Sequence, residues 1–170
     1  MDGTTLRALQ APLKKRYRED PTSAMVTLKA RGQLGEGLTC TVETRNALIE
    51  TGLHPATGGD GHSACSGDML LEALVACAGV TLRAVATSMG IAIKKGTVSA
   101  EGELDFRGTL GVSKEAPVGF KSIRLHFDLD SNATKEQLES LLNLTERYCV
   151  VYQTLRVPPP VAVAYTASDA

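Results

Sequence analysis

The sequence predicts an α+β protein, because helical and strand-forming segments alternate along the chain. Residues 66–89 form a long, mostly apolar run with helical periodicity, and a second helix signal begins at Thr134. Residues 98–106 and 123–129 instead alternate apolar and polar side chains, as strands with one solvated face do. We therefore expect antiparallel sheets wrapped around two central helices.

Length and charge narrow the functional classes. The chain has 170 residues, 43% of them hydrophobic, which is enough for one domain with a sizeable core. Its 18 basic and 19 acidic residues nearly cancel, so the composition provides no broad attraction to nucleic acid or to an anionic membrane. The amino terminus lacks a signal-peptide pattern, and no apolar run is expected to reach the roughly 20 residues that span a bilayer. We expect a cytoplasmic protein with mostly reduced cysteines.

An amphipathic helix is predicted over residues 4–20, where apolar side chains recur at spacings of three and four. Basic residues occupy the other positions, and Pro12 is a candidate point for a bend. The helix is expected to pack one stripe on the core, with docking to a membrane or a partner as the alternative. We assign residues 1–24 to an amino-terminal helical extension and residues 25–170 to the main domain.

Extended structure is predicted next, over residues 26–30 and 38–43, which are rich in β-branched side chains. The three glycines between residues 32 and 37 predict that a turn joins these strands into a hairpin. Two further strands are predicted over residues 98–106 and 123–129, and a short final strand over residues 161–165.

A long surface loop is predicted over residues 52–67, which are rich in glycine. Ser66 is expected to cap the helix that follows, with Asp68 in its first turn, where the helix dipole favours a negative charge. The helix is predicted to run to Met89, with Gly90 as the residue that ends it. A helix so apolar on most faces belongs in the centre of a fold or at a subunit interface.

The second helix is predicted to begin with a capping box, formed by Thr134 and by Gln137 three residues later. Its apolar stripe runs through Leu138 and Leu141 and closes at Cys149. This places a thiol at the end of the helix.

Two cysteines are candidate chemical groups. Cys77 lies midway along the long helix among small side chains, which leave room for another molecule to approach its sulfur. Cys149 lies beside Arg147, and if a new turn begins there, free N–H groups and the neighbouring cation favour the nucleophilic thiolate. Packing remains the alternative for both positions, since free cysteine is among the most buried residue types.

The segments around both thiols carry recognisable motifs. The first is a glycine-rich loop, Gly58-Gly59-Asp60-Gly61, followed by Ser66-Gly67-Asp68-Met69-Leu70-Leu71-Glu72-Ala73-Leu74-Val75-Ala76-Cys77. The second is Glu146-Arg147-Tyr148-Cys149-Val150-Val151, with Thr154-Leu155 after it. Both segments resemble the OsmC/Ohr family of osmotically inducible protein C-like and organic hydroperoxide resistance-like proteins. The resemblance covers residues 25–165 and leaves the amino-terminal helix outside.

The resemblance implies a thiol-dependent peroxidase that reduces organic hydroperoxides in the response to oxidative stress. It further implies an intertwined homodimer with the active sites at the subunit interface. By position, Cys77 would be the peroxidatic thiolate and Cys149 the resolving thiol. Attack on the O–O bond gives a sulfenic acid, which condenses with the second thiol to a disulfide that an external dithiol reduces. Neither a metal nor an organic cofactor is expected.

Several positions depart from the family pattern. The second cysteine is commonly followed by proline, and Val150 stands there instead, which alters a pre-set helical turn. The carboxylate ten residues before the first cysteine would fall on Gly67. Asp68 is therefore the preferred carboxylate for orienting an arginine, with Glu72 as the alternative.

The family also supplies an arginine from its early strands, which holds the thiolate by charge and hydrogen bonds. Arg31 and Arg45 are the candidates, and Arg31 is favoured. Because the carboxylate is shifted and the arginine is not firmly assigned, the chain could belong to a branch of the family whose activity is weak or directed at another substrate.

Other sites remain as alternatives. His54, His62, Cys65 and Cys40 could bind zinc, although no C-x-x-C or H-x-x-x-H spacing of a closed structural site occurs. A non-catalytic dimer could instead bind a small apolar ligand at the subunit interface. Serine hydrolase and nucleotide-binding motifs do not occur.

Cys65 is an unsuitable disulfide partner for Cys77, because 12 residues of helix would separate them by roughly 18 Å. A disulfide requires the two Cα atoms to lie within about 4.4 to 6.8 Å of each other.

Overall fold

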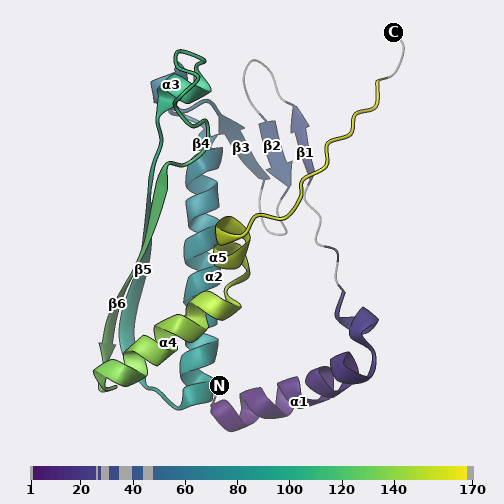
Figure 1. Ribbon diagram of the computed structural model, residues 1–170, viewed down its shortest axis with the longest axis vertical. Coiled ribbons are helices and arrows are strands. Elements are labelled where there is room, and N and C mark those ends of the chain that lie inside the picture. Colours follow the sequence, from purple (N-terminus) through teal and green to yellow (C-terminus); the bar gives the residue numbers. More distant parts are fainter. Residues whose placement is uncertain (1, 26, 28–30, 35–39, 44–47, 168–170) are drawn as a thin grey trace.

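A computed structural model describes residues 2–25, 27, 31–34, 40–43 and 48–167. The long helix α2 (Ser66–Met89) runs through the middle of the molecule, and a ribbon of two strands, β5 (Ile93–Glu103) and β6 (Ser122–Ser131), lies along one side of it (Figure 1). Helix α4 (Lys135–Tyr148) crosses α2, and α5 (Val150–Arg156) follows beside the middle of α2 (Figure 1). The combination of helices and sheets confirms the predicted α+β class.

The remaining elements are mostly short. They are α1 (Gly3–Glu19), η1 (Pro21–Ala24), β1 (Arg31–Leu34), β2 (Cys40–Glu43), β3 (Leu48–Gly52), η2 (Pro55–Thr57), β4 (Ala64–Cys65) and α3 (Phe106–Thr109). Helix α1 confirms the helix predicted over residues 4–20, and its first turn lies against the end of α2 (Figure 1). A Cβ on Gly3 would lie 2.8 Å from the carbonyl oxygen of Thr87, so the two backbones touch there. The domain boundary between residues 24 and 25 stays a prediction.

Helix α2 has the predicted length, but its first turn differs from the prediction. Cys65, not Ser66, is the N-cap residue, and its side chain makes no capping hydrogen bond. Asp68 lies in the first turn, as predicted. Gly90 ends the helix with a φ of 70°, a left-handed conformation that glycine adopts without a steric penalty.

Helix α4 begins with the predicted capping box. The Thr134 hydroxyl accepts from the Gln137 N–H at 3.3 Å, and the Gln137 side chain accepts from the Thr134 N–H at 2.9 Å. The helix ends at Cys149, whose N–H donates to the Thr145 carbonyl at 2.9 Å. Because α5 begins at the next residue, Cys149 is at once the C-cap of one helix and the N-cap of another.

The strands form two sheets. β5 and β6 pair antiparallel, with Val98 opposite Phe127. β6 extends beyond its predicted range at both ends, whereas β5 begins before residue 98 and ends at Glu103, short of the predicted Phe106, which begins α3. The other sheet has the order β1, β2, β3, β4. Its last pair is parallel, with Thr51 opposite Ala64, which departs from the purely antiparallel prediction. The segment predicted as a loop over residues 52–67 thus contains both η2 and β4.

The strands predicted over residues 26–30 and 161–165 are not found in the described structure. The strand predicted over residues 26–30 falls mostly outside the described residues, and the first described strand, β1, includes Gly32, which the sequence placed in the turn. The final strand predicted over residues 161–165 is wrong, since the described tail has no strand there and Val161 is 84% exposed. An alternating segment becomes a strand only when a neighbouring strand accepts its hydrogen bonds, and this tail runs away from the body (Figure 1).

The core lies where α2, α4 and the β5–β6 ribbon meet. Leu82, Ala86, Ile93 and Leu141 form a buried cluster there. Side chains at positions 82 and 86 share one face of α2, because they are four residues apart. This packing fixes α4 against α2 and so determines where the end of α4 lies.

Helix α2 also corrects the expectation about membrane-spanning length. It is 24 residues long and contains a window of mean hydropathy 1.8, so by length and composition it could cross a membrane. Of that window, 22% is buried. One such helix is weak evidence of a span, because the central helix of a soluble protein has the same length and composition.

Candidate active site

Two cysteines from distant parts of the sequence face each other at the junction of three helices. Cys77 lies in the middle of α2 and is half-buried, whereas Cys149 lies between α4 and α5 and is 1% exposed. A hydrogen bond joins the two side chains. The packing of α4 and α5 against α2 thus brings together the two residues that the sequence singled out.

The surroundings of Cys77 favour its thiolate. Burial by itself raises the pKa of Cys77, but the N–H of Val151, the thiol of Cys149, the N–H of Val150 and the Thr81 hydroxyl all donate to its sulfur. The net result is a pKa of Cys77 below the ordinary thiol value of 9.0. A lowered pKa increases the fraction of nucleophilic thiolate at neutral pH.

Cys149 shows the opposite shift. Burial raises the pKa of Cys149, and the hydrogen bond and negative charge of a Cys77 thiolate raise it further, outweighing donation from the N–H groups of Tyr152 and Val151. The two shifts have opposite directions, so Cys77 ionises more readily than Cys149. This division provides an attacking group and a second thiol that can react after it.

Sequence reasoning missed the donors around Cys77. Thr81 lies four residues after it, one helical turn away, so the spacing alone could have identified the hydroxyl. The N–H groups of Val150 and Val151 depend on how α5 packs against α2, which no local pattern in the sequence indicates.

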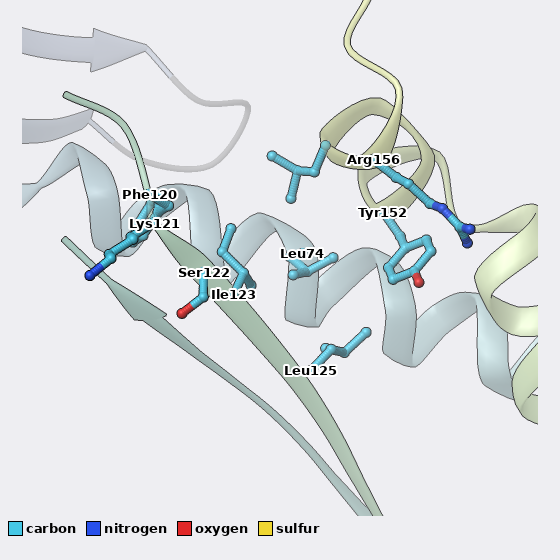
Figure 2. Close-up of a pocket in the computed structure, with 9 residues that line it drawn as sticks. Leu74, Phe120, Lys121, Ser122, Ile123, Leu125, Tyr152 and Arg156 are labelled. Atoms are coloured by element: carbon cyan, nitrogen blue, oxygen red, sulfur yellow. The ribbon is translucent and has the colours of Figure 1, made fainter. Parts of the chain in front are cut away.

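A pocket of about 320 Å³ lies between α2, β6 and α5, and neither Cys77 nor Cys149 lines it. Figure 2 shows Leu74 of α2 and Tyr152 of α5 facing this pocket, with Lys121 and Ser122 at the opposite edge. Leu74 is one helical turn before Cys77, and Tyr152 is three residues after Cys149. The walls are mostly apolar, which suits the organic part of a small molecule.

The structure describes the predicted assisting residues only in part. Arg31 is the first residue of β1, opposite Glu43 of β2, and Arg45 lies outside the described residues. Asp68 and Glu72 are exposed on α2. Asp68 is nine residues before Cys77, two and a half turns along the helix, and so projects from the opposite face. Their roles stay predictions.

A family model described as OsmC-like protein matches residues 59–164, which is more than half of the chain and includes both cysteines. The chain belongs to the OsmC-like family. No curated protein matches the sequence. Residues before position 59, including α1, lie outside the match with the family model.

Solved structures share the fold of this OsmC-like protein. An OsmC-like protein from Mycoplasma pneumoniae aligns with a TM-score of 0.66 and 18% identity, covering 78% of this chain and 89% of that one. An organic hydroperoxide resistance protein from Elizabethkingia anophelis aligns with a TM-score of 0.63 and 19% identity, covering 79% and 91%. OhrB of Bacillus subtilis, an organic hydroperoxide resistance protein, aligns with a TM-score of 0.55 and 18% identity, covering 79% of this chain and 94% of that one. At these identities the likeness establishes the fold alone.

Three of the four residues considered for zinc have described surroundings in the OsmC-like fold. His54 stacks on Phe106 with ring centroids 4.9 Å apart, and its Nδ1 accepts from the Ala56 N–H. His62 is exposed, and Cys65 caps α2. Within the part of the chain that the structure describes, no three His, Cys, Asp or Glu side chains gather as a metal site.

Proposed function

We propose that this OsmC-like protein is a thiol-dependent peroxidase that reduces organic hydroperoxides. The observation that carries the proposal is the paired thiols, with the pKa of Cys77 lowered and that of Cys149 raised. The OsmC-like fold and its likeness to proteins described as organic hydroperoxide resistance proteins support the same reaction class.

The proposed cycle uses both sulfurs. The Cys77 thiolate attacks the terminal oxygen of the hydroperoxide, the O–O bond breaks, and the leaving alkoxide takes a proton to become an alcohol. Cys77 is thereby oxidised to a sulfenic acid. The Cys149 thiol attacks that sulfur and water leaves, which gives a Cys77–Cys149 disulfide. An external dithiol returns both residues to thiols and is itself oxidised to a disulfide, so the cycle needs no metal or organic cofactor.

The assisting groups form a further part of the proposal. Arg31 is proposed to hold the thiolate and the peroxide by charge, and Asp68, or Glu72 in its place, to orient that arginine. A second copy of the chain is proposed to complete the site by covering the apolar side chains that α2 exposes, of which Val80 is 73% exposed. We place the working protein in the cytoplasm, where a dithiol reductant keeps the pair reduced.

The decisive experiment treats reduced protein with about one equivalent of cumene hydroperoxide, the two-electron stoichiometry of thiol oxidation, followed by thiol counting and mass spectrometry. The wild type should lose two thiols and form the Cys77–Cys149 disulfide, while Cys149→Ser should stop at a sulfenic acid on Cys77. Cys65→Ser is the matched control, since Cys65 is the N-cap of α2, twelve residues before Cys77, and its thiol should not affect the reaction. Full hydroperoxide turnover by Cys77→Ser would refute the proposal.

Binding of a small apolar ligand without catalysis is the second candidate function. A groove of about 600 Å³ favours it, lined by α1, α2 and α4 with Val80, Ala84, Val85 and Leu144 among its apolar residues. Under this alternative both thiols survive the hydroperoxide, and an apolar fluorescent probe binds equally well to wild type and to Cys77→Ser.

A further inference from the structure

Two hydrogen bonds connect α4 to α5 across the residue that separates them. The Tyr152 hydroxyl donates to Glu146 Oε2 at 2.9 Å, and the Gln153 side-chain amide donates to the Glu146 carbonyl oxygen at 2.8 Å. Both donors are on α5, and the acceptor residue is in the last turn of α4. Cys149 lies between these helices with an extended backbone, φ −74° and ψ 110°.

We propose that Glu146 is a positioning residue, which fixes the angle between α4 and α5 and so holds Cys149, together with the first N–H groups of α5, against Cys77. The inference rests on the proposed thiol chemistry and adds a residue to it.

We call the two hydrogen bonds from Tyr152 and Gln153 to Glu146 the clamp. The geometry of the break at Cys149 explains why such a clamp is needed. The backbone leaves the α-helical region at this residue, so the regular hydrogen-bond ladder of α4 does not continue into α5. Across the break, the Cys149 carbonyl accepts only from within α5, through the Gln153 N–H at 2.9 Å. The two contacts to Glu146 therefore supply the cross-connection that the ladder does not.

Tyr152 links this clamp to the neighbouring pocket. Its ring forms part of the pocket wall that includes Leu74 (Figure 2). Its hydroxyl donates to Glu146. Burial and the bond to Glu146 raise the pKa of Tyr152, so the hydroxyl remains protonated and keeps donating throughout the pH range in which the thiols titrate.

The test measures two properties of the thiol pair that do not require peroxidase activity. One is the rate at which diamide, an oxidant that takes two electrons and two protons from a thiol pair, forms the Cys77–Cys149 disulfide. The other is the pH profile of Cys77 alkylation by iodoacetamide. Circular dichroism confirms that each variant is folded under the assay conditions.

The double variant Tyr152→Phe/Gln153→Leu removes both donors and keeps the side-chain volumes close to the originals. We expect disulfide formation to slow by about tenfold or more, because a small displacement of reacting groups has a large effect on rate. The alkylation profile should move to higher pH. Tyr148→Phe makes the same chemical change at an exposed tyrosine four residues before Tyr152 and should leave both measurements unchanged.

Variants at Glu146 distinguish an effect on the position of Cys149 from an effect on the stability of the whole protein. Glu146→Gln retains an oxygen that accepts from the Tyr152 hydroxyl and should behave as wild type, whereas Glu146→Leu should slow disulfide formation. The proposal is overturned if folded Glu146→Leu and the double variant oxidise and titrate like wild type. Absence of hydroperoxide turnover in wild type would instead refute only the proposed function, since diamide and iodoacetamide report on the clamp independently.

Discussion

The side chain of Thr81 is one of four donors to the Cys77 sulfur, and its contribution can be isolated. Thr81→Val keeps the shape of the side chain and removes the hydroxyl, so the thiolate loses a donor and the pKa of Cys77 should rise. We expect alkylation of Cys77 at neutral pH to slow about three- to tenfold, the range expected for one hydrogen bond to a charged group in a half-exposed site.

The pH dependence of Cys77 alkylation shows in which direction the Thr81 variant shifts the pKa of Cys77. In wild type the alkylation rate should rise through a midpoint below pH 9.0, because the pKa of Cys77 is lowered from that value. In Thr81→Val the midpoint should move upward, and the two rates should converge at high pH, where both thiols are fully ionised. A midpoint that stays in place would show that the hydroxyl does not act on the sulfur.

Val150 occupies the position where the family commonly has proline, and this departure adds a donor. A valine carries an N–H, which proline lacks, and this N–H donates to Cys77. Val150→Pro should remove the donor with little effect on folding, because position 150 is the first residue of α5 and Cys149 before it is already extended. We expect Cys77 alkylation at neutral pH to slow severalfold.

Val150→Ala is the matched control for the proline variant. It removes most of a side chain that is 69% exposed and leaves the N–H in place, so it should alkylate at the wild-type rate. Equal rates for the proline and alanine variants would contradict a role for this N–H.

At the scale of secondary structure, the long helices α1, α2 and α4 could be predicted from the sequence, whereas the short helices α3 and α5 were not predicted and the strands were predicted only in part. Apolar periodicity and local caps define α2 and α4, and these signals are contained within each helix, as the Thr134 capping box shows. A strand depends on a neighbour that is distant in sequence. The alternation of residues 161–165 was therefore not enough to make a strand. The parallel pairing of β3 with β4 had no local signal in the sequence.

The same distinction applies to the candidate site. Cys77 and Cys149 could be singled out chiefly because the segments around them resemble the OsmC/Ohr motifs, since their positions on the predicted helices left packing as an alternative. The clamp on Glu146 could not be predicted, since it depends on the backbone angle at Cys149. Arg31 lies on a short strand, and its relation to the thiols depends on packing that the sequence pattern does not specify.

The packing of α4 against α2 also sets the stability of the site. Leu141 has 0% exposure and lies in the core cluster between these helices. Leu141→Ala should lower the free energy of unfolding by about 2–5 kcal/mol, through lost apolar burial and the cavity left behind. Urea denaturation followed by circular dichroism measures the change.

Val157→Ala is the comparison for Leu141→Ala, since Val157 is 70% exposed beyond the end of α5. Its effect should remain within about 0.5 kcal/mol, as for most surface positions. Equal losses in the two variants would contradict the assignment of the core.

At the scale of the whole molecule, the exposed apolar residues of α2 bear on assembly. Leu70 is 38% exposed, Val80 73% and Met89 36%, although α2 runs through the middle of the fold (Figure 1). Apolar side chains gathered on one helix and left in water are typical of an interface, and the family resemblance implies a homodimer. The low buried fraction of α2 is then a property of the single chain, and a second copy would complete the core around this helix.

Placing a charge at position 80 of α2 tests the dimer. Val80→Glu should destabilise a dimer that buries position 80, because an unpaired carboxylate removed from water costs several kcal/mol. In sedimentation equilibrium the variant should therefore behave as a monomer at concentrations where the wild type is dimeric. Val112→Glu places the same charge at a valine that is 72% exposed in the turn after α3, outside helix α2, and should remain a dimer. If both variants keep the wild-type mass, position 80 of α2 does not lie in a subunit interface.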